Sequence, residues 1–289
     1  MNACSKLIEE LINLEQKLFS GVATIIASDR KQWKIYFYRG MLIWAEGGSH
    51  VYRFWQRYLY RICPQADVEL FDREKIYSNS ITDYYFINTL IKNKLATRKQ
   101  IYHLIEQKIV NIFFDIFQVE NKQTIKIEVK DKSAHNLLKE NFNLTLPPLE
   151  IYQLLSKAYR QWIVWQSKGL ASCSPNLAPV LKKEITNSQI PPIIWTNMKR
   201  TLDGQRTLRD LALQTNKDVF QLTRSLIPYF LKGYIRLVEI PDLTEINLRS
   251  RRTHGGSRTS QDAMQTASRF ALATAIGQAD IFKAATSVH

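Results

Sequence analysis

Apolar side chains in the first fifty residues follow two different periods. From residue 5 to residue 19 they recur every three or four positions, which predicts an amphipathic helix. The members of its apolar side are Leu7, Ile8, Leu11, Leu14 and Leu18. Residues 21–27, 33–38 and 41–45 are instead short runs rich in β-branched and aromatic side chains, separated by tight turns. These runs predict an antiparallel meander of three strands, one face of which helices must cover.

Helical spacing then returns in three longer segments. Residues 51–62 place Phe54 and Trp55 among other apolar side chains at helical spacing. A capping box at 97–100 begins a long helix, and residues 149–167 form a third helix that is rich in aromatics. The inward side chains expected of the long helix are Ile101, Leu104, Ile105, Ile109, Ile112, Phe113, Ile116 and Phe117. Residues 124–129 alternate and predict a further strand, so the expected fold class is α+β.

The organisation changes after residue 172. Four prolines within residues 172–192 indicate a loop and a boundary between subdomains. Beyond it come two helices, a capped third helix closed by Gly233, and a strand at 234–238. Helix, turn, helix and then strand is the order of a winged-helix module, although only one wing strand is evident.

These patterns give three expected regions. Residues 1–185 form an α+β domain, residues 193–243 a winged-helix-like subdomain of the same module, and residues 249–289 a basic low-complexity tail that we expect to be disordered. Two further elements are expected with less regular patterns. They are a short strand at 68–71 and a helix capped by Asp83.

Composition narrows the classes of partner and compartment. The net charge is +14, which favours acidic protein surfaces, membrane surfaces or nucleic acid as partners without choosing among them. Cys4, Cys63 and Cys173 are isolated and odd in number, as expected in a reducing cytoplasm. The first residues lack the apolar core of a signal peptide, and no stretch has the roughly 18–20 apolar residues of a membrane span. We therefore expect a cytoplasmic protein that does not insert into membranes.

Several local phrases, taken in their order, resemble one known family. They lie at 38–45 (Tyr-Arg-Gly-Met-Leu-Ile-Trp-Ala), 50–57, 63–64, 111–115, 174–180, 204–212 and 223–229. Together they resemble the PATAN domain, the N-terminal domain of cyanobacterial PatA-type response regulators, over roughly residues 1–245. The resemblance implies a non-enzymatic signalling adaptor of a two-component-type pathway that acts by protein–protein interaction.

The same resemblance implies processes and partners. Family members are linked to phototaxis, type IV pilus control and heterocyst patterning. The implied partners are a pilus motor ATPase, a photoreceptor or a receiver-containing signalling protein. Relatives usually continue into a receiver domain with a phosphoacceptor Asp. In this sequence the only aspartates after Leu243 are Asp262 and Asp280. We therefore expect no phosphoacceptor here, and a small phosphodonor should leave the chain unlabelled.

Candidate partner-binding residues lie in the helix predicted over 51–62. Arg53, Arg57 and Arg61 fall four apart, and guanidinium groups in a row suit the carboxylates of an acidic partner. The alternative is a solvated helix face with local ion pairs. Trp55 is either an anchor at an interface or a core residue that covers the neighbouring sheet.

A DNA-binding transcriptional regulator is the alternative function. Within the helix-turn-helix segment 207–238, Gln221 and Arg224 would approach base edges and Lys217 a phosphate. Against this stand the mixed charge of the helix and its many apolar residues. Winged helices also serve as protein-docking modules.

Catalytic chemistry has little support in the sequence. The five histidines are scattered, and neither a His pair at metal-ligand spacing nor a nucleophile or phosphate-binding motif occurs. Asp115 lies mid-helix among aromatics and is best interpreted as a structural carboxylate. We therefore predict no enzyme activity, no catalytic residues, no metal site and no cofactor.

Overall fold

The computed structural model describes residues 5–62, 87–88, 90–133, 149–182 and 190–243. The chain divides into two compact units, unit 1 (Met1–Ser172) and unit 2 (Cys173–His289), which are described separately below. The strand expected at 68–71, the first residues (83–86) of the helix expected after Asp83 and the tail 249–289 lie outside the described residues, whereas residues 87–88 and 90–92 of that helix are helical, as predicted.

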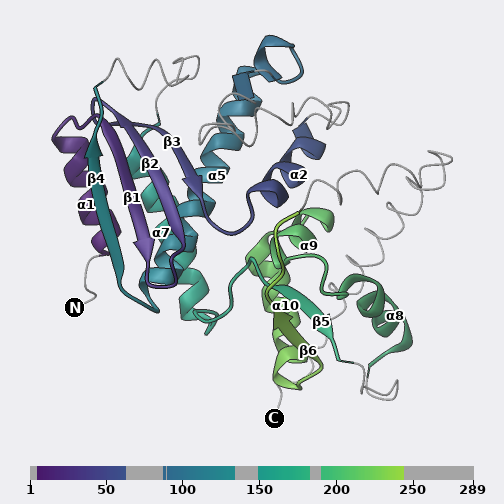
Figure 1. Cartoon of the computed structure of the whole chain (residues 1–289). Coiled ribbons are helices and arrows are strands. Elements are labelled where there is room, and N and C mark those ends of the chain that lie inside the picture. Colours follow the sequence, from purple (N-terminus) through teal and green to yellow (C-terminus); the bar gives the residue numbers. More distant parts are fainter. Residues whose placement is uncertain (1–4, 63–86, 89, 134–148, 183–189, 244–289) are drawn as a thin grey trace. The chain divides into compact units, whose positions relative to one another are not determined.

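A four-stranded antiparallel sheet forms the centre of unit 1, with the strand order β3-β2-β1-β4 (Figure 1). Its strands are β1 (Gly21–Ala27), β2 (Gln32–Tyr38), β3 (Met41–Gly47) and β4 (Ile125–Asp131). Short connections join β1, β2 and β3 into a meander. The strand β4 comes after a long helix in the sequence and pairs with β1. The predicted α+β class and the antiparallel sheet are confirmed.

Helices accompany the sheet of unit 1, and the sequence explains where the longest of those described begins. They are α1 (Lys6–Gln16), α2 (Val51–Ile62), α5 (Arg98–Glu120) and α7 (Ile151–Ser167). The capping box of Thr97 with Gln100 begins α5, and all eight side chains predicted to face inward from this helix are buried. The prediction for Leu18 was wrong: α1 ends at Gln16, and Leu18 is 70% exposed in a turn with a φ of 51°.

Unit 2 is a small helical unit with a two-stranded sheet. Its elements are β5 (Ala178–Leu181), α8 (Pro192–Thr201), α9 (Leu208–Gln214), α10 (Val219–Leu231) and β6 (Ile235–Val238). One apolar cluster joins them, with Trp195 and Met198 from α8, Leu211 from α9, and Leu222 and Leu226 from α10. The unit therefore has a core of its own.

The strand β5 lies within the segment that the prolines predicted to be a loop. It pairs with β6 in antiparallel register, from Ala178 opposite Val238 to Leu181 opposite Ile235. Because β6 pairs with a strand that precedes α8, unit 2 begins at Cys173 and not near residue 193. Pro179 has no N–H to donate, and its position is tolerated because each strand of a two-stranded sheet is an edge strand.

Candidate functional site

The arginines expected to form an exposed row on α2 do not lie together in solvent. Arg53 is buried, with 7% of its surface exposed, and Arg57 is half-buried. Arg61 lies in the last turn of the helix, where the structure does not describe side chains. A docking side chain must be accessible, so Arg53 does not meet that requirement in this structure.

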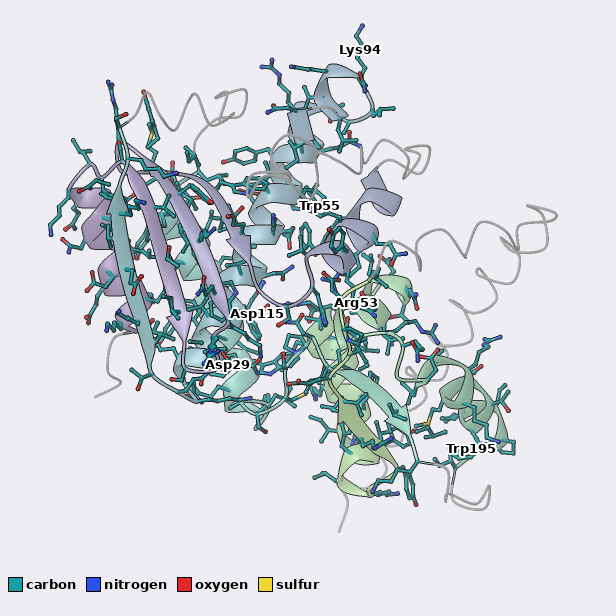
Figure 2. All side chains as sticks on the ribbon, in the orientation of Figure 1. Asp29, Arg53, Trp55, Lys94, Asp115 and Trp195 are labelled. Atoms are coloured by element: carbon teal, nitrogen blue, oxygen red, sulfur yellow. The ribbon has the colours of Figure 1, made fainter. Side chains whose placement is uncertain are left out.

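Trp55 also faces the interior of unit 1 (Figure 2). It is 3% exposed and meets Phe54 edge-on, with the ring centroids 5.5 Å apart. Arg53, Phe54 and Trp55 are consecutive, and consecutive helical residues point about 100° apart. Because these three consecutive residues are buried, more than half of the circumference of α2 is buried at its first turns. Of the two interpretations of Trp55, the structure favours the core residue.

A buried lysine on α5 contacts two tryptophan rings in this part of the core. The Nζ atom of Lys108 lies 4.4 Å from the ring centroid of Trp44 and 5.3 Å from that of Trp55. Lys108 is only 5% exposed, so its ammonium group is enclosed by the faces of two indole rings. Such cation–π contacts strengthen when water is excluded. We call Lys108, Trp44 and Trp55 the lysine cage; it links α5, β3 and α2.

Sequence analysis missed the lysine cage, although a signal was present. Lys108 lies four residues after Leu104 and four before Ile112, on the apolar side of α5. Residues at this spacing share one helix face, so a lysine between two core residues is a buried lysine that needs a partner. The partners, Trp44 and Trp55, come from distant parts of the chain and are visible only in the fold.

The outer side of α7 carries apolar and basic residues together. Ile163 and Val164 are 36% and 47% exposed. Arg160, three residues before Ile163, and Lys168, four residues after Val164, are also exposed. No acidic residue occurs between Ile151 and Lys168. We call Arg160, Ile163, Val164 and Lys168 the α7 surface.

The four apolar residues 162–165 could have revealed this surface in advance. Trp162 and Trp165 are buried at 4% and 1% exposure, and both rings meet the ring of Phe114 on α5 edge-on. A helix packed on one side cannot bury four consecutive residues, because they point in directions that cover most of its circumference. Burial of the two tryptophans therefore leaves Ile163 and Val164 in solvent.

Two of the residues predicted to contact nucleic acid lie on α10, and the third lies two residues before it. Gln221 and Arg224 are both exposed, and Lys217, just before the helix, is partly exposed. The residues between and after them, Leu222, Thr223, Ser225 and Leu226, are buried. We call Lys217, Gln221 and Arg224 the α10 face.

The sequence predicts a structural carboxylate at Asp115 and no metal site. Asp115 is half-buried on α5 (Figure 2). Within the described ranges, no three His, Cys, Asp or Glu side chains are grouped so that they could hold a metal ion. None of the helices described combines the length and apolar character needed to cross a membrane.

Comparisons with known proteins assign neither a family nor a function to the chain. No protein-family model, curated protein or solved structure matches the chain. The resemblance to the PATAN domain therefore stays a prediction that rests on the residues that carry it.

Proposed function

We propose that the protein is a non-enzymatic signalling adaptor of a two-component-type pathway, as its resemblance to PATAN domains implies, and that it binds its partner through the α7 surface. The single observation that supports this docking position is an exposed apolar pair flanked by cations on a helix without acidic residues. The proposal moves the docking position from α2 to α7, because Arg53 and Trp55 are buried.

The chemistry of the α7 surface defines the partner that fits it. Val164 and Ile163 supply apolar area whose burial is favourable at about 25 cal/mol per Å². Arg160 and Lys168 attract carboxylates, and a net charge of +14 accelerates encounter with any acidic protein. The expected partner is therefore a protein surface with an apolar centre and an acidic rim. A motor ATPase, a photoreceptor or a receiver domain is a candidate if it carries such a surface.

Two matched substitutions test this proposal. Val164→Glu places a carboxylate within the α7 surface, where we expect binding to weaken tenfold or more. Val129→Glu is the control, because Val129 lies in the same unit, on β4, with 46% exposure against 47% for Val164. Both variants should retain the wild-type melting temperature, since both positions are exposed.

The partner itself is found by photo-crosslinking in a cyanobacterial lysate. A photoreactive amino acid at position 164 should capture an acidic protein that position 129 does not capture. The affinity of the purified partner is then measured by titration against the wild type and both variants. Equal affinity of the Val164→Glu and Val129→Glu variants would show that the α7 surface is not the docking site.

A further inference from the structure

The α10 face in unit 2 has the chemistry of a nucleic-acid-reading helix. We propose that α10 enters the major groove of duplex DNA, with Gln221 and Arg224 at base edges and Lys217 at a phosphate. This inference concerns unit 2 alone and does not depend on the α7 surface. It would give the adaptor a direct contact with a promoter or another DNA site.

The connection between α9 and α10 has the form used by DNA-binding helix pairs. Four residues separate the two helices, which is within the three- to four-residue turn of a helix-turn-helix. Asn216 takes a left-handed conformation in this turn, with a φ of 52°, where such motifs often use glycine. The N–H of Lys217 donates back to the carbonyl oxygen of Ala212 at 2.9 Å and closes the turn.

The core of unit 2 fixes α10 against α9. Leu208 and Leu211 from α9 belong to the same apolar cluster as Leu222 and Leu226 from α10. Buried residues on one side of α10 hold the opposite side at the surface. The exposed side chains therefore project from a rigid platform, which recognition of base edges requires.

The position of the polar residues within α10 matches base reading. Gln221 and Arg224 are three residues apart and lie in the first two turns, so they share one face near the beginning of the helix. Recognition helices contact base edges with their N-terminal residues. An arginine binds guanine through two hydrogen bonds, and a glutamine binds adenine in the same way. The exposed Leu231 lies at the other end of the helix, away from this contact.

The electrostatics near the α10 face also favour a polyanion. Residues 219–231 contain no acid, and their one basic residue is the exposed Arg224 of the α10 face. The nearest carboxylate, Asp218, accepts hydrogen bonds from the backbone N–H groups of Phe220 and Gln221 as the cap of α10. Its charge is thereby offset by the positive end of the helix.

The other two acids of the helical region are also engaged within the protein. Asp210 forms the capping box of α9 with Thr207, and Asp203 forms an ion pair with Arg206 at 2.9 Å. Residues 190–243 hold eight lysines and arginines against five acids, a net charge of +3, and this excess favours an approaching phosphate.

Selection from a random duplex library with the full chain tests the inference. We expect an enriched sequence of a few base pairs. Arg224→Ala should weaken binding to that sequence about 5- to 150-fold and relax the preference at one base pair. Arg200→Ala is the matched control, because Arg200 is an exposed arginine of the same unit on α8. Its loss should weaken binding less than about threefold and leave the preference unchanged.

A second variant separates charge from base reading. Arg224→Lys keeps the positive charge but loses the planar fork, so it should retain the salt dependence and lose the base preference. Circular dichroism confirms that the variants are folded. Failure to enrich any sequence, equal losses for Arg224→Ala and Arg200→Ala, or tighter binding of single strands or RNA than of duplex DNA would each overturn the inference.

Discussion

Replacement of Trp55 distinguishes a core residue from a docking residue. Trp55 is 3% exposed, meets Phe54 edge-on and faces the Lys108 ammonium across 5.3 Å. A tryptophan that anchors a partner would instead be exposed in the free protein, and its removal would leave stability nearly unchanged. The change to test is Trp55→Ala.

The expected cost follows from what the side chain contacts. A buried tryptophan replaced by alanine costs about 3–5 kcal/mol, through lost burial and the cavity that remains. Loss of the cation–π contact with Lys108 adds about 0.5–2 kcal/mol, although such contributions are not strictly additive. We therefore expect the free energy of unfolding of unit 1 to fall by about 4 kcal/mol. In a unit of this size, that corresponds to a melting temperature lower by roughly 8–16 °C.

The assay is urea and thermal unfolding followed by far-UV circular dichroism, which does not depend on the tryptophan signal. Because the chain has two units, hydrogen exchange on peptides from β3 and α5 localises the change to unit 1. Tyr152→Ala on α7 is the matched control, since Tyr152 is an aromatic residue of the same unit with 66% exposure. Its stability should stay within about 0.5 kcal/mol of the wild type.

A double-mutant cycle tests the lysine cage itself. Lys108→Met keeps the length of the side chain and removes the charge. Combined with Trp55→Ala, the cycle should give a coupling energy of about 0.5–2 kcal/mol. A coupling energy near zero would refute the cation–π interpretation, and a Trp55→Ala protein as stable as the Tyr152→Ala control would refute the assignment of Trp55 to the core.

Three further predictions concern single positions. Gly47→Ala should destabilise unit 1 by more than about 1 kcal/mol in urea unfolding, because Gly47 has a φ of 104° and a Cβ there would lie 2.3 Å from the backbone oxygen of Gln32. Thr97→Ala should cost about 1 kcal/mol in the same assay through loss of the cap of α5. Burial raises the pKa of the Tyr229 phenol above 10.0, so the folded state holds the proton more tightly than the unfolded state. Stability is then lost as the pH rises above about 10, and Tyr229→Phe should reduce this loss between about pH 9 and pH 11.

Local patterns in the sequence were sufficient for most of the described elements. The runs of β-branched and aromatic residues within 21–45 predicted the meander, and the capping box at Thr97 predicted the first residue of α5. The reason is that hydrogen bonding and side-chain direction within one element depend on neighbours in the sequence. Leu18 shows where this reasoning fails. It keeps the helical spacing, yet the helix ends before it.

The features that sequence reasoning missed depend on contacts between distant segments. The strand β5 forms because it pairs with β6, more than fifty residues later in the sequence. Without that partner, residues 175–179 with their two prolines have the pattern of a loop. Arg53 is polar and was expected in solvent, but its neighbours Phe54 and Trp55 draw the first turns of α2 into the core. Neither outcome follows from a local period.

The α7 surface leads to one more prediction, which separates binding from stability at a single residue. Val164 is 47% exposed and β-branched, so it contributes little packing and lowers helix propensity relative to alanine. Val164→Ala should therefore leave the free energy of unfolding unchanged or raise it by up to about 0.5 kcal/mol. If the partner docks on this surface, the same substitution weakens its affinity. A variant that is equally or more stable but binds less tightly is expected only of a residue whose role is at an interface. A Val164→Ala protein that loses stability by more than about 1 kcal/mol would instead place Val164 in the core and remove the basis of the docking proposal.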